Sequence, residues 1–129
     1  MKIYNAKEAN SFPDAILFDT DNTLYPYDPS HLAAMNEVER KVVKNFSITS
    51  KDFSRAYDEA RQDIKRRLKG TASSHSRLLY MQRMLEIMGL GSQVLVALDL
   101  EQTYWRTFLN SAVLFDGVTE LLDDIRLFG

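Results

Sequence analysis

The sequence predicts a predominantly α-helical chain with one short β-strand near its N-terminus. The strand prediction rests on residues 15–18, an apolar, β-prone run that follows the turn residues Pro13 and Asp14. Five later segments carry apolar residues at helical spacing, and we find no second convincing strand. With 129 residues and 45% hydrophobic content, the chain can bury one ordinary core but has no surplus for a second large domain.

Two carboxylates follow this strand directly, at the edge where open α/β sheets bind ligands. Because side chains alternate along an extended backbone, Asp19 and Asp21 would lie on one side, where their charges repel. A cation or a shared proton would relieve this repulsion. Mg²⁺ prefers carboxylate, carbonyl and water oxygens, and a phosphate beside two carboxylates almost requires such an ion. The pattern therefore indicates a carboxylate nucleophile with a neighbouring general acid/base on a metal-dependent phosphoryl-transfer site.

Two other interpretations of the acidic pair are weaker. An isolated Asp-x-Asp is usually a turn or a solvated cap, but here a predicted strand precedes it and Thr23 and Leu24 follow it. A calcium-binding EF-hand loop is a poor match, because Leu24 stands where that loop needs its Gly and Ser30 where it needs the bidentate Glu.

The segment Phe-Asp-Thr-Asp-Asn-Thr-Leu-Tyr at 18–25 resembles the first motif of the haloacid dehalogenase-like superfamily, in which a hydrophobic strand ends in Asp-x-Asp-x-Thr. The resemblance implies an α/β parent fold, a Rossmann-like core with a helical cap. It also implies that Asp19 becomes an aspartyl-phosphate and binds Mg²⁺ through its other oxygen. Asp21 would protonate the leaving alcohol, activate water and bind the metal through its backbone carbonyl. Thr23 would orient the loop, while backbone N–H groups around Thr20 and Asp21 would hold the phosphoryl oxygens.

These arguments assign a role to each candidate site residue. Asp19 and Asp21 are the expected catalytic residues and metal ligands, with Mg²⁺ as the cofactor. His75 stands at a predicted helix N-terminus, where backbone donors favour anions, although a surface or capping histidine is the commoner case. The expected substrate-binding residues are Thr20, Asn22, Thr23 and His75.

The resemblance also divides the chain into regions. Residues 24–26, followed by a helical insert, are similar to the branch with a helical cap after the first strand, which includes small-molecule phosphatases and pyrimidine 5′-nucleotidases. Residues 104–105 and 114–122 are similar to the segment where that cap returns to the core, although Asp116 stands where Pro is common. The expected regions are the first strand and nucleophile loop of the core (1–29), the helical cap (30–112) and the return helix of the core (113–129).

Four amphipathic helices with short connections predict a small antiparallel bundle for the cap. Thr49 followed by Asp52 resembles a capping box at the start of the second helix, and Gly70 and Gly89 are expected to follow helix ends. The predicted helices lie at about 30–46, 50–69, 74–88 and 92–109, with a fifth at about 116–129. We expect interior positions for Tyr104, Trp105 and the methionines at 35, 81, 84 and 88.

Part of the expected phosphatase machinery cannot be assigned to this sequence. In the resembled family the next segments would be a strand that ends in Ser or Thr, then a Lys, then an acidic pair. Those groups would bind phosphate, neutralise the nucleophile and supply carboxylates to Mg²⁺. We therefore expect the chain to be the N-terminal part of a phosphatase of small phosphorylated metabolites, truncated after Gly129 and inactive alone.

The composition of the chain argues against nucleic acid and membranes as partners. The net charge is −2, from 16 basic and 18 acidic residues, so no global field favours nucleic acid or an anionic membrane. The basic residues at 65–69 are expected to be a solvated helix end. There are no cysteines, no signal-peptide apolar region and no run of about 18 apolar residues, so we expect a cytoplasmic protein.

A function of a different class stays open at this stage. A non-catalytic helical module could keep the acidic loop and act by binding or self-association. A lone strand has unpaired edges, and a homodimer of the truncated form would cover them.

Overall fold

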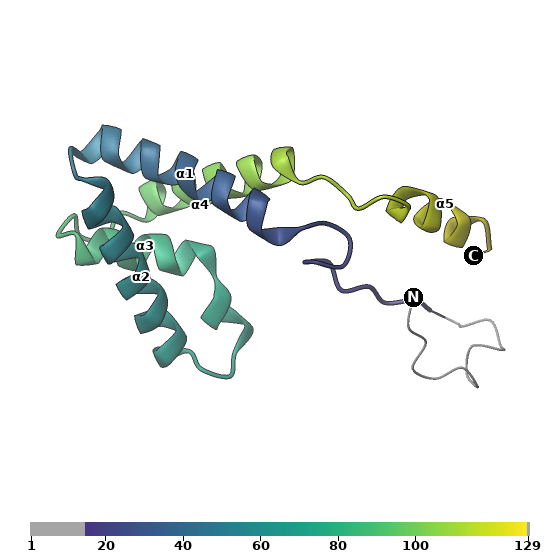
Figure 1. The fold of residues 1–129 in the computed structure, drawn as a ribbon. Helices are drawn as coiled ribbons and strands as arrows, with labels where there is room; N and C mark the ends of the chain where they lie inside the picture. Colours follow the sequence, from purple (N-terminus) through teal and green to yellow (C-terminus); the bar gives the residue numbers. More distant parts are fainter. Residues whose placement is uncertain (1–14, 129) are drawn as a thin grey trace.

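The computed structural model describes residues 15–128, which contain five α-helices and one short 3-10 helix (Figure 1). The chain is therefore mostly helical, as predicted. Within these residues, no helix combines the length and apolar character that crossing a membrane requires. The elements are α1 (Tyr27–Phe46), α2 (Ser50–Arg67), η2 (Ala72–His75), α3 (Arg77–Ile87), α4 (Val94–Ser111) and α5 (Val118–Phe128).

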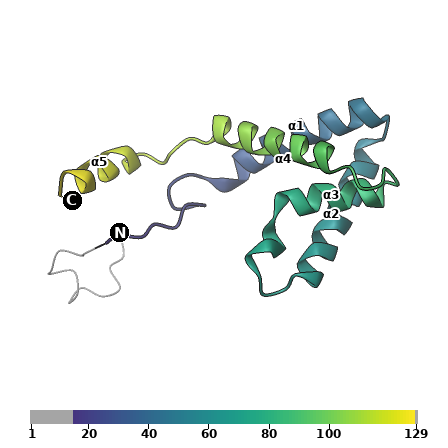
Figure 2. The ribbon, with the colours of Figure 1, turned by 180° about the vertical axis from the view of Figure 1, so that it is seen from behind.

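The first four α-helices form one bundle, and α5 stands apart from it. α1 packs along α4, α2 packs along α3, and α3 also contacts α4. Figures 1 and 2 show that α5 and the residues before α1 leave the bundle at the same end. In the described chain α5 makes no helix–helix contact with the bundle. A hydrogen bond from the Phe115 N–H to the Leu24 carbonyl, 2.9 Å long, joins these two departing segments.

Capping groups and glycines set several of the helix ends. Thr49 Oγ1 accepts a hydrogen bond from the Asp52 N–H at 3.1 Å, which confirms the predicted cap of α2. The same hydroxyl donates to the Asp52 carboxylate at 2.7 Å. Gly70 follows α2 with φ of +85° and Gly89 follows α3 with φ of +76°, a left-handed backbone that residues with a side chain rarely adopt. Both glycines lie just beyond a helix, as predicted.

Two helix starts differ from the prediction. α1 begins at Tyr27 rather than near Ser30, because Pro29 fits the first turn, where backbone N–H groups have no intrahelical acceptor. The segment predicted as one helix over 74–88 is divided in two. η2 ends at His75, and Ser76 then caps α3 by accepting a hydrogen bond from the Leu79 N–H.

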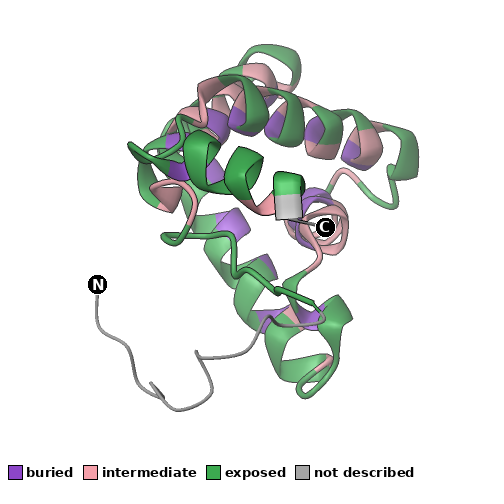
Figure 3. Ribbon diagram, turned by 90° about the vertical axis from the view of Figure 1, so that its right-hand side faces the viewer, coloured by how far each residue is buried: buried purple, intermediate pink, exposed green. Residues whose placement is uncertain are grey.

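The core of the bundle is built from apolar and aromatic side chains of α1 to α4. Buried and exposed residues alternate along these helices (Figure 3), as amphipathic periodicity requires. The methionine prediction is confirmed, since Met81 and Met84 are fully buried and Met35 and Met88 pack against the core. The largest fully buried side chains include Tyr80, Tyr104, Phe108, Met81, Met84, Leu85 and Leu100.

The two neighbouring aromatic residues of α4 have different environments. Tyr104 is fully buried, as predicted, but the prediction for Trp105 is wrong, because 43% of its surface stays exposed. Successive helical residues point about 100° apart, so Tyr104 and Phe108 share the core-facing side and Trp105 lies at its rim. The indole still packs edge-to-face on both rings, at centroid distances of 5.1 and 5.7 Å.

The predicted strand at about 15–19 is not formed. Residues 15–20 are neither helix nor strand, and Leu17 is 96% exposed. Within 15–128 the one β-type pairing is an isolated bridge between Asp21 and Tyr25. A strand needs a neighbour for its backbone hydrogen bonds, and the described residues supply none for this run. Pro13 and Asp14, on which the prediction partly rested, lie outside the described residues.

Candidate active site

The two aspartates lie in a tight loop between the extended segment and α1. The Asn22 N–H donates to the Tyr25 carbonyl at 2.8 Å, and the Leu24 N–H donates to the Thr20 carbonyl at 2.9 Å. Asn22 adopts φ of +58°, a left-handed conformation that asparagine tolerates better than most residues. These bonds fold residues 20–25 back on themselves, so the acidic pair is held by its own loop.

Each carboxylate accepts a hydrogen bond from a hydroxyl four residues later. Thr23 Oγ1 donates to Asp19 Oδ2 at 3.0 Å, and the Tyr25 hydroxyl donates to Asp21 Oδ1 at 2.7 Å. The bond to Asp21 raises the pKa of Tyr25, with a further contribution from burial. Both aspartates are solvent-exposed. The second oxygen of each carboxylate therefore stays accessible to a ligand.

The bundle fixes the position of this loop. The Tyr27 N–H, at the start of α1, donates to Asn22 Oδ1 at 3.0 Å. The Tyr25 ring packs edge-to-face on Phe108 of α4, with 5.9 Å between centroids, and Tyr27 packs on the same ring at 5.6 Å. The loop is thus attached to both α1 and α4.

The loop alone supplies an incomplete metal site. No group of three or more potential His, Cys, Asp or Glu ligands occurs among the residues the structure describes. Two accessible carboxylates nevertheless fit Mg²⁺, which commonly takes one or two protein carboxylates together with water and substrate phosphate oxygens. Asp19 and Asp21 are the residues that could hold it.

The predicted substrate residues fall into two places. Thr20, Asn22 and Thr23 lie together in the loop, whereas His75 lies at the end of η2. His75 lines a cavity of about 330 Å³ between α1, α2 and the start of α3. The residues around the cavity are Tyr27, His31, Tyr57, Arg61, Lys65, His75, Arg77 and Tyr80.

Most residues that line this cavity were not predicted from the sequence. No role was predicted for Arg61 or Arg77 from the sequence. A signal was present in the spacing, because Tyr57, Arg61 and Lys65 are four residues apart and so share one face of α2. What the sequence lacked was the knowledge that this face meets α1 and α3.

An aromatic network supports the α1 side of the cavity. Arg77 Nη2 donates to the Tyr27 hydroxyl at 2.6 Å, and the Tyr27 ring stacks on His31 with 5.1 Å between centroids. His31 Nδ1 lies 2.7 Å from the hydroxyl of the buried Tyr104. Burial raises the pKa of Tyr104, so its hydroxyl stays protonated and can donate to a neutral imidazole. Tyr27 therefore belongs to both the loop and the cavity.

The basic cluster at the end of α2 is divided between two environments. Arg66 and Arg67 form ion pairs with Asp63, at 2.6 and 2.9 Å, and Arg83 of α3 joins them at 2.9 Å. Lys65 instead lines the cavity. The prediction of a solvated helix end is correct, because these side chains are exposed. It did not include the ion pairs with Asp63 or the position of Lys65 at the cavity.

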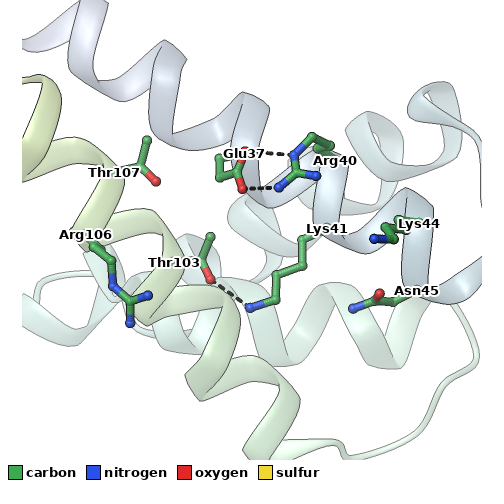
Figure 4. Close-up of a pocket in the computed structure, with 8 residues that line it drawn as sticks. All are labelled: Glu37, Arg40, Lys41, Lys44, Asn45, Thr103, Arg106 and Thr107. Atoms are coloured by element: carbon green, nitrogen blue, oxygen red, sulfur yellow. Dashed lines mark hydrogen bonds and ion pairs between the residues drawn. The ribbon is translucent and has the colours of Figure 1, made fainter.

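A second hollow lies between α1 and α4 (Figure 4). It has a volume of about 370 Å³ and is also lined by basic residues. Two of them are already paired: Arg40 Nε donates to Glu37 at 2.9 Å, and Lys41 Nζ donates to Asp99 at 2.7 Å. Lys41 also donates to Thr103 at 3.0 Å. The two Lys41 contacts join α1 to α4.

His31 should make the stability of the bundle depend on pH. Burial lowers the pKa of His31 below its usual value near 6.5, as does the charge of Arg77, while Asp28 opposes them. Below about pH 6.5 the unfolded chain therefore binds a proton before the folded chain does, and the free energy of unfolding decreases as pH falls. We expect His31→Gln to reduce this decrease, measured by urea denaturation at about pH 7 and pH 5.

His75→Gln, which changes an exposed histidine, is the matched control, and the effect of His31→Gln on the pH dependence should exceed the effect of this control. An unaltered pH dependence in His31→Gln would contradict the role assigned to His31.

The chain is similar to the ribulose-1,5-bisphosphate 5-phosphatase of Halopiger xanaduensis, with 35% identity over 113 residues. The matched region covers 87% of this chain and 47% of the relative, so the chain spans about half the length of that protein. No protein-family model and no solved structure matches the chain.

Proposed function

We propose that this chain is the nucleophile-loop and cap portion of a Mg²⁺-dependent, haloacid dehalogenase-like phosphatase of small phosphorylated metabolites. The observation that carries the proposal is the loop at 18–25, in which two accessible carboxylates are each fixed by one hydroxyl donor. The similarity of the chain to a named phosphatase supports the same reaction class.

Asp19 would act first, as the nucleophile. Its free oxygen attacks phosphorus, the ester P–O bond breaks, and Asp21 gives a proton to the departing alcohol oxygen. In the second half, Asp21 takes a proton from water as the water oxygen attacks phosphorus. The bond between phosphorus and Asp19 then breaks, which releases inorganic phosphate and restores the carboxylate. When bound, Mg²⁺ would neutralise charge on the phosphate and the carboxylates.

In this proposal the chain comprises a core loop (1–29), a helical cap (30–112) and a return segment of the core (113–129). The relative is about twice as long as the matched region. We propose that the remaining phosphate and metal ligands of the phosphatase come from segments that correspond to the rest of the relative. The name of this relative makes sugar phosphates, including sugar bisphosphates, the first substrates to test.

The apolar surface at the end that carries the loop gives a second candidate some support. Leu17, Val113, Leu114 and Phe115 are exposed there, at 43% to 96% of their surface. Another chain could cover such a patch, as in a self-associating module without catalysis. A homodimer that persists in light scattering on dilution, together with no phosphatase activity in the full-length protein, would favour this alternative.

The proposed activity can be tested directly on the full-length protein. We expect Mg²⁺-dependent phosphate release from a panel that includes ribulose 1,5-bisphosphate and ribulose 5-phosphate, and loss of that release with EDTA. We expect little activity from the 129-residue chain, because loss of one transition-state ligand costs about 3 kcal/mol, or more than a hundredfold. Phosphate release by the full-length protein that EDTA does not affect would refute the metal-dependent mechanism.

A further inference from the structure

The cavity between α1, α2 and α3 collects positive charge without an acidic residue to balance it. Arg61 and Lys65 come from α2 and Arg77 comes from α3, and the imidazole rings of His31 and His75 line the cavity beside them. None of the eight residues that line the cavity is acidic. Tyrosine hydroxyls of Tyr27, Tyr57 and Tyr80 supply the remaining polar atoms.

The cavity lacks the acidic residues that pair with several cations elsewhere in the bundle. Arg40, Lys41, Arg66 and Arg67 each form an ion pair with a neighbouring Asp or Glu. Within residues 15–128, no such pair involves the cations of the cavity. Their mutual repulsion is therefore uncompensated unless an anion enters between them.

Arg77 is positioned rather than mobile. Its guanidinium lies over the Tyr80 and Tyr104 rings, 5.7 and 5.2 Å from the centroids, and it donates to the Tyr27 hydroxyl. Its Nε is buried and has no hydrogen-bond partner in the described structure. A buried, unsatisfied N–H is costly, and a bound anion or an ordered water would relieve that cost.

A phosphate group suits these donors. Arginine pairs with phosphate through two parallel N–H donors, and lysine adds a point charge. Arg61, Lys65 and Arg77 thus offer several charge-assisted donors to one tetrahedral group. A cavity of about 330 Å³ has room for such a group and part of its carbon chain.

Tyr27 connects this cavity to the nucleophile loop. Its backbone N–H holds Asn22 Oδ1 at 3.0 Å, while its hydroxyl accepts from Arg77 at 2.6 Å. Tyr27 therefore contacts both Asn22 of the loop and Arg77 of the cavity. A substrate held at both places would carry one phosphate at Asp19 and a second in the cavity.

We propose that the cavity holds the second phosphate of a bisphosphorylated substrate, the group that is not transferred to Asp19. This assignment rests on the proposed function and adds the substrate class to it. Arg61 and Lys65 are then specificity-determining residues that favour bisphosphates over monophosphates.

A binding experiment on the 129-residue chain tests the anion site without catalysis. Inorganic phosphate is titrated into isotope-labelled chain at constant ionic strength, and amide chemical shifts are followed by NMR. We expect saturable shifts at Arg61, Lys65 and residues 75–77. Arg61→Gln should weaken binding about tenfold or more, because it removes charge-assisted hydrogen bonds.

Arg61 is preferred to Arg77 for this variant, because its side chain is exposed and its loss should not disturb the fold. Lys44→Gln is the matched control, with the same change of charge on an exposed residue beside the hollow between α1 and α4. It should alter phosphate binding less than twofold. Absence of saturable shifts at the cavity, or equal weakening by both variants, would overturn the anion site.

Kinetics on the full-length protein then distinguish a substrate phosphate from free phosphate. We expect Arg61→Gln to lower kcat/KM for the bisphosphate about tenfold or more, through a higher KM. For the matched monophosphate, kcat/KM should change less than twofold. Equal losses on both substrates would overturn the second-phosphate assignment. If the full-length protein hydrolyses no phosphate ester, the proposed function fails and this assignment falls with it, whereas the NMR result still decides whether the cavity binds anions.

Discussion

Asp19→Asn in the full-length protein should abolish phosphate release, with a loss of at least about 10⁴-fold in kcat. Asparagine keeps the shape of the side chain and can still accept a hydrogen bond from Thr23, but its amide cannot form the aspartyl-phosphate. Turnover is measured as phosphate release with Mg²⁺ present. The covalent step is measured separately, by trapping with beryllium fluoride, which should require Asp19.

Asp21→Asn is the matched control for this experiment, because it removes the same charge two residues away in the same loop. It should lower turnover by about 10²–10⁴-fold, the usual contribution of proton transfer, and still allow trapping at Asp19. Trapping by the Asp19→Asn protein at the level of the unaltered protein would rule out Asp19 as the nucleophile. Full activity of Asp21→Asn would rule out its role in proton transfer.

The helical part of the fold could be predicted because its determinants are local. The cap at Thr49, the glycines after α2 and α3, and the apolar stripe of α2 act within a few residues of where they occur. The two clear errors concern interactions that are not local. A strand at 15–19 depends on neighbouring strands, and the exposure of Trp105 depends on which helices pack beside α4.

In the candidate site, too, the local contacts could be predicted from the sequence and the contacts between helices could not. The loop could be found from its sequence, since the aspartates, Thr23 and Tyr25 lie within seven residues of one another and interact through short-range hydrogen bonds. The basic cavity could not, because Arg61 and Arg77 come from different helices and meet through the packing of α2 on α3. His75 is the one cavity residue assigned to substrate binding in advance, and that role stays a prediction.

Phe108→Ala should cause the largest loss of stability among the changes considered, about 3–5 kcal/mol, since it removes a large buried ring and leaves a cavity. Phe108 is 2% exposed and contacts the rings of Tyr25, Tyr27, Tyr104 and Trp105. Two of these residues also hold the acidic loop, so the same change should release the loop from α4. Urea denaturation of the 129-residue chain measures the loss.

Leu109→Ala is the control on the next residue of α4. Its side chain is 68% exposed, so the free energy of unfolding should change by less than about 0.5 kcal/mol. Similar losses for the two variants would show that the core does not center on Phe108. Because a domain is typically stable by about 5–15 kcal/mol, the Phe108 loss is a large share of the total. The position of the acidic loop depends on the same packing, since Tyr25 and Tyr27 contact the Phe108 ring.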